Sequence, residues 1–84
     1  MTVIIRWRLA AAHSGRRAAD KLFERDSRPS DARVKIVLDV ICTGLAELML
    51  EHRENDDTID EAAAAMADAF IERVTILETA CIVD

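Results

Sequence analysis

The chain has 84 residues, of which 51% are hydrophobic and 32% are charged, with a formal net charge of −5. This length predicts a single domain spanning residues 1–84. So high a hydrophobic content excludes an intrinsically disordered chain, and no apolar run approaches the ~20 residues that a membrane span needs. Because glycine, proline and aromatic residues are few, the composition favours helices over strands.

The first predicted element is a helix over residues 3–25. Small and apolar side chains recur on one side of it, at Ile4, Ala11, Gly15, Ala18 and Leu22. Glycine in a helix costs about 1 kcal/mol relative to alanine. We expect Gly15 to offset this cost by letting another helix backbone come close. The alternation of apolar and basic residues over positions 2–9 leaves a short strand as the alternative there.

The second predicted element is a helix over residues 31–52. Pro29 cannot continue a preceding helix, and Ser30 is a good N-cap ahead of Asp31. The predicted packing side consists of Val34, Val37, Leu38, Ile41, Leu45, Leu48 and Met49. Three more apolar residues, Ile36, Val40 and Leu50, fall on the other side. One packing surface therefore does not cover this helix.

The third predicted element is a helix over residues 59–82. Thr58 and Glu61 match the capping box, in which each side chain accepts a backbone N–H of the other residue. Apolar residues then follow at steps of three and four: Ile59, Ala63, Met66, Phe70, Val74, Leu77 and Cys81. The prediction is an all-α protein of three antiparallel helices in up-down-up order. Since apolar positions exceed what one such core buries, we expect a homodimer or higher oligomer through the second and third helices.

Charge is distributed unevenly along the chain. Residues 1–35 carry nine basic and four acidic groups, a net charge of +5, whereas residues 36–84 carry two basic and twelve acidic groups, a net charge of −10. Such asymmetry indicates either attraction between the halves, within the fold or across a dimer, or an anionic partner for the basic half.

The predicted binding site is a set of basic residues on the first helix, which we term the basic face: Arg6, His13, Arg16, Arg17 and Lys21. Arginine side chains bind carboxylates and phosphates through paired N–H donors, and histidine adds a further donor. The alternative is a solvated surface with local ion pairs, Arg16 with Asp20 and Lys21 with Glu24. Each such pair contributes only a few tenths of a kcal/mol.

Other candidate sites receive weaker support. The acidic cluster Glu51, Glu54, Asp56, Asp57, Asp60 and Glu61 lacks the central glycine and alternating carboxylates of a calcium loop. His13, His52, Cys42 and Cys81 have no metal-ligand spacing, and no residue stands in a nucleophile motif. We expect two reduced thiols on packed helix faces and a partly buried structural His52. No catalytic activity, metal ion or cofactor is predicted.

The function predicted from these features is that of a small cytoplasmic regulatory or inhibitory protein–protein interaction module, acting as a homo-oligomer with charged faces. An alternative is a sequestering or sensing module that binds a small anionic ligand, such as a nucleotide, at the basic first helix. Nucleic-acid binding is a further alternative, disfavoured because the chain as a whole is acidic.

Overall fold

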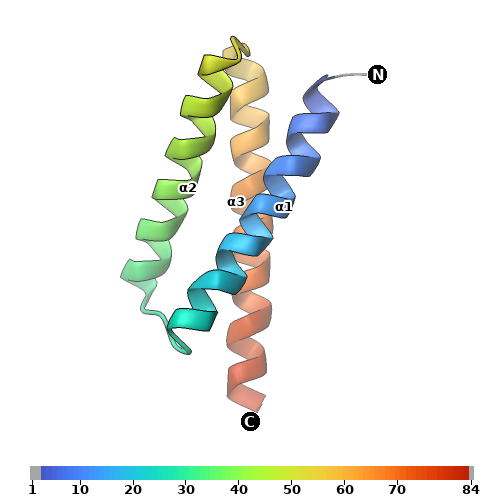
Figure 1. Cartoon of the computed structure of the whole chain (residues 1–84). Coiled ribbons are helices and arrows are strands. Elements are labelled where there is room, and N and C mark those ends of the chain that lie inside the picture. The colour runs from blue at the N-terminus through green and yellow to red at the C-terminus, as the bar shows by residue number, and fades with distance from the viewer. Residues whose placement is uncertain (1–2, 84) are drawn as a thin grey trace.

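Three α-helices joined by two short turns make up the computed structural model, which describes residues 3–83 and the side chains from Trp7 to Ala80. The helices are α1 (Val3–Arg25), α2 (Asp31–Glu51) and α3 (Asp56–Val83). They run in up-down-up order, so the all-α antiparallel prediction is confirmed (Figure 1). The strand alternative near the N-terminus is wrong, because α1 is helical from Val3 onwards and no described segment forms a strand to pair with it.

Helix α3 carries most of the packing in this fold. It contacts α1 extensively along an oblique crossing, and it also contacts α2, whereas α1 and α2 touch each other little (Figure 1). One broad side of α2 is therefore left without a neighbour in the chain.

Gly15 marks the closest approach of α1 and α3. A Cβ atom at Gly15 would lie 2.5 Å from the carbonyl oxygen of Met66 and 3.2 Å from the backbone nitrogen of Phe70. The two helix backbones are thus in direct contact, and even a methyl group does not fit between them. The prediction of a close-packing glycine at this position is confirmed.

The core divides into two clusters on either side of this crossing. The first contains the buried residues Ala11, Met49, Ile59, Ala62 and Met66. The second contains Ala19, Leu22, Phe70 and Val74. Phe70 and Met49 are the largest of the fully buried side chains. The apolar side predicted for α3 therefore faces the core, although Cys81 falls outside the described side chains.

Capping groups define where α2 and α3 begin. Ser30 caps α2 as predicted, since its Oγ accepts the backbone N–H of Arg33 at 3.1 Å. Helix α3, however, begins at Asp56 rather than at residue 59. Its cap is Asn55, whose Oδ1 accepts the backbone N–H of Thr58 at 2.8 Å. The predicted capping box is wrong, because asparagine is at least as good a cap as threonine and lies one turn earlier.

The turn between α2 and α3 is tight. The backbone N–H of Glu54 donates to the carbonyl of Met49, and that of Arg53 donates to the carbonyl of Leu50, both at 3.0 Å. This pair of bonds is the Schellman motif, which places one residue in the left-handed region. Arg53 takes that role with φ 60°, where glycine is more usual. The turn folds α3 back alongside α2.

Several large apolar side chains remain exposed. On α2 the exposed fractions are 62% for Ile36, 64% for Val40 and 58% for Leu50, as the sequence predicts. Leu48 is 45% exposed, although its spacing placed it on the packing side. It lies at the edge of that side, and α2 has few contacts with α1, so the edge is not covered.

Candidate functional site

The basic face lies on the side of α1 that points away from the other helices. Ala11, Gly15 and Ala19 hold the opposite side of α1 against α3, so the basic residues are turned outwards. His13, Arg16, Arg17 and Lys21 are all exposed, and the side chain of Arg6 lies outside the described residues. His13, Arg17 and Lys21 follow one another at four-residue steps, which brings them into one row along the helix.

Neither of the local ion pairs considered for this face is formed in the described part of the chain. Asp20 instead accepts a hydrogen bond from Nε of Arg73 on α3 at 2.7 Å. Arg16 therefore lacks its expected carboxylate, and Lys21 and Glu24 do not form an ion pair either. The physical reason is the close crossing at Gly15, which brings Arg73 within reach of Asp20.

In the ion pair between Asp20 and Arg73, each partner carries the charge that is in the minority in its half of the chain. Its acid comes from the basic half of the chain and its base from the acidic half. The described residues thus show no direct pairing of the basic face with the acidic second half. What the arrangement offers is the charged donors of Arg16, Arg17 and Lys21, open to solvent and suited to carboxylate or phosphate groups on another molecule.

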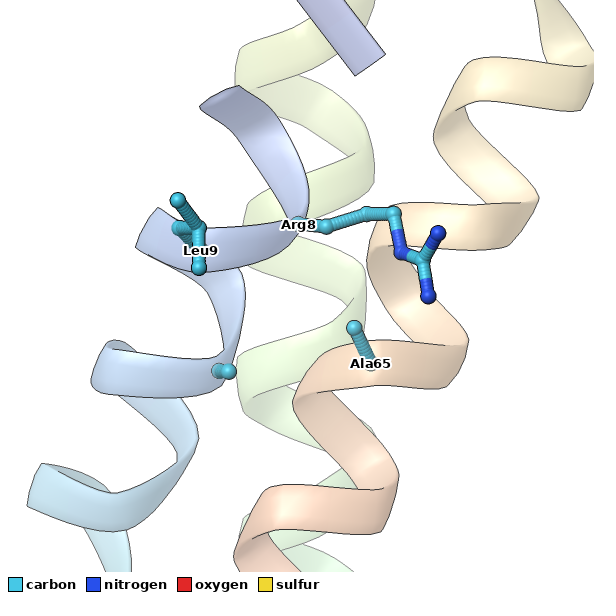
Figure 2. A pocket seen from close by; sticks show the side chains of 4 residues that line it. Arg8, Leu9 and Ala65 are labelled. Carbon is cyan, nitrogen blue, oxygen red and sulfur yellow. The ribbon is translucent and has the colours of Figure 1, made fainter. Parts of the chain in front are cut away.

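Arg8 occupies a separate place beside the contact between α1 and α3. It lines a hollow of about 260 Å³ together with Leu9, Ala12 and Ala65. Figure 2 shows its side chain reaching from α1 across to α3, while Leu9 points to the other side. An adjoining hollow is also lined by Glu61 and Asp68 of α3.

Arg8 is not among the site residues predicted from the sequence. The signal that could have distinguished it is its spacing: Arg8 precedes Gly15 by about two helical turns, which places it beside the helix contact. Arg8 is consequently not a member of the basic face, although both belong to α1.

The thiol and imidazole groups form no common site among the described side chains. Cys42 is a half-buried free thiol. Burial raises the pKa of Cys42, and the carboxylate of Asp39 raises it further. At neutral pH the thiol is therefore protonated and a weak nucleophile. Cys81 lies outside the described side chains.

His52 is exposed, so the expectation of a partly buried histidine is wrong. It stands at the C-cap, just beyond the last turn of α2. Its ring meets that of Trp7 edge-on, with the ring centroids 5.9 Å apart and the planes inclined by 62°. The contact joins the N-terminal part of α1 to the end of α2.

Within the described residues, no three His, Cys, Asp or Glu side chains gather in a way that could hold a metal ion. None of the described helices is long and apolar enough to cross a membrane. Comparison of the chain with protein-family models, with curated proteins and with solved structures finds no match.

Proposed function

We propose that this protein is a small regulatory or inhibitory interaction module that acts as a homo-oligomer and binds an acidic surface of another protein through the basic face of α1. One observation carries the proposal. His13, Arg16, Arg17 and Lys21 are exposed together on one side of α1, and the nearest candidate acid, Asp20, is bonded to Arg73. Basic side chains in such a row favour a partner that supplies carboxylates.

The proposal includes a cytoplasmic location and no catalytic activity. Cys42 forms no disulfide within the described residues, and in the reducing conditions of the cytosol such a thiol would stay reduced. The raised pKa of Cys42 keeps its thiol protonated at neutral pH and a weak nucleophile, which suits a structural residue of a binding protein.

The test is a paired capture experiment from lysate of the native host, read by mass spectrometry. The baits are the wild-type chain, the double reversal Arg16→Glu/Arg17→Glu, and the matched control Arg25→Glu/Arg28→Glu. Both double variants change the net charge equally and alter exposed residues. We expect both to keep their stability to within about 0.5 kcal/mol, as is usual for exposed positions.

Proteins captured by the wild type and the control but lost with Arg16→Glu/Arg17→Glu would support the proposal. Identical captured sets from all three baits would refute it. Titration of the purified chain with ATP and with duplex DNA addresses the two alternatives. Binding to a DNA backbone weakens steeply between about 50 and 200 mM salt, whereas binding of a small anion in a defined site depends on salt far less.

A further inference from the structure

The outer side of α2 carries an apolar row that no other part of the described chain covers. Ile36, Val40, Gly44 and Leu48 follow at four-residue steps, and the three large side chains are 62%, 64% and 45% exposed. Residues at such steps are neighbours on the helix surface, so they form one continuous strip. We term these four residues, with Arg33 and Glu51 at the ends, the outer face of α2.

Gly44 lies near the middle of this face and is open to solvent. A Cβ atom built at Gly44 would have nothing within 4 Å, in contrast to Gly15. A hollow of about 430 Å³ lies there, lined by Asp39, Val40, Thr43, Gly44 and Glu47. The helix cost of glycine is therefore not offset at Gly44 by any contact within the chain. A side chain from a second molecule has room to enter at this point.

The outer face of α2 is symmetric about its own midpoint. Three pairs of positions on it are centred on residue 42: Arg33 with Glu51, Ile36 with Leu48, and Val40 with Gly44. A two-fold axis level with that position, passing between Val40 and Gly44 on the outer side, matches each residue to the second member of its pair, as a symmetric dimer requires. Ile36 of each copy then lies level with Leu48 of the other, and Val40 lies level with Gly44, beside the carboxylates of Asp39 and Glu47.

The two charges at the ends of this face, Arg33 and Glu51, favour one direction of pairing between two copies. Arg33 and Glu51 lie about five helical turns apart and so on the same side of α2. In an antiparallel pair, Arg33 of each copy lies opposite Glu51 of the other. A parallel pair in register would set arginine against arginine and glutamate against glutamate, which is unfavourable.

We propose that the outer face of α2 binds the same face of a second copy of this chain, antiparallel and about a two-fold axis that passes between Val40 and Gly44. Val40 of each copy fills the hollow over Gly44 of the other, and two pairs of Arg33 with Glu51 close the ends. This inference rests on the homo-oligomer of the proposed function, and it assigns the contact to α2 instead of to α2 and α3 together.

The test is sedimentation equilibrium of the full chain at micromolar to submillimolar concentration. We expect a reversible wild-type dimer and a monomeric Val40→Glu variant with an unchanged helical circular-dichroism spectrum, because Val40 is 64% exposed in the single chain. The matched control is Ile76→Glu on α3, where the native side chain is 50% exposed. We expect this control to remain dimeric.

Charge reversal tests the antiparallel direction. Arg33→Glu and Glu51→Arg should each weaken dimerisation by about tenfold, because each places like charges together at both ends of the pair. The combined variant Arg33→Glu/Glu51→Arg restores opposite charges and should regain wild-type affinity. Failure of the combined variant to recover would overturn the antiparallel arrangement.

The remaining outcomes separate this inference from the proposed function. A wild-type chain that stays monomeric overturns the dimer together with the oligomeric part of that function. A dimer that survives Val40→Glu but dissociates in Ile76→Glu leaves the oligomer standing and overturns the contact through α2. Arg16→Glu/Arg17→Glu alters a different helix and should sediment like the wild type.

Discussion

At the scale of single residues, the two glycines have the same chemistry and opposite surroundings. Gly15 is buried against the Met66 carbonyl, whereas Gly44 stands in open space on α2. Sequence alone places both inside helices and assigns both the same helix cost of about 1 kcal/mol. Only at Gly15 does a close helix contact offset that cost.

This contrast predicts opposite effects of one substitution. Gly15→Ala should lower the free energy of unfolding by about 1–3 kcal/mol, because its Cβ forces α1 and α3 apart. Gly44→Ala should raise the stability of the monomer by up to about 1 kcal/mol, because its Cβ meets nothing and the helix cost of glycine is removed. Urea unfolding of both variants in the Val40→Glu background, where dimerisation is excluded, measures the two effects. Equal effects at the two positions would contradict the close crossing at Gly15.

At the scale of the elements, the helices were predicted well and one of their ends was not. The four-residue steps of α1 and the cap at Ser30 depend on local spacing and local hydrogen bonds, which sequence patterns capture. The start of α3 was misplaced because Asn55 and Thr58 are both acceptable caps. The choice between them depends on the turn at Arg53, which sets where the chain can re-enter a helix.

The cap of α3 is testable with two small substitutions. Asn55→Ala should destabilise the protein by about 1 kcal/mol, because the backbone N–H of Thr58 loses its acceptor. Thr58→Val should change stability by less than about 0.5 kcal/mol, since it keeps the buried shape and the cap of α3 uses the backbone N–H of Thr58. Ser30→Ala, at the confirmed cap of α2, is the matched control and should resemble Asn55→Ala. A larger loss of stability for Thr58→Val than for Asn55→Ala would contradict Asn55 as the cap and support the capping box at Thr58.

At the scale of the whole molecule, the apolar residues are shared between an interior and an outer surface. The two core clusters are built around α3, and one side of α2 is left open. A chain of 84 residues has limited stability as a monomer. Covering that open side by a second copy would add apolar burial that the single chain cannot provide.

Dimerisation through α2 therefore predicts that thermal stability depends on protein concentration. Binding between native chains stabilises the folded state by mass action. Over a hundredfold rise in concentration, Tm should increase by on the order of 5 °C for a domain of this size. Val40→Glu should abolish the dependence, and Ile76→Glu should keep it. A wild-type Tm that is constant across the range would contradict the dimer.

The sequence by itself determined the helical class, the three elements and the side of α1 that carries the basic residues. These features follow from the local spacing of apolar, small and basic residues, which acts over one or two turns. The tertiary structure alone decided that Asp20 pairs with Arg73 rather than with Arg16, because that choice depends on how closely α1 and α3 cross. It also decided which side of α2 stays open. Both sides of α2 carry apolar residues, and only packing against α3 distinguishes the side that is covered.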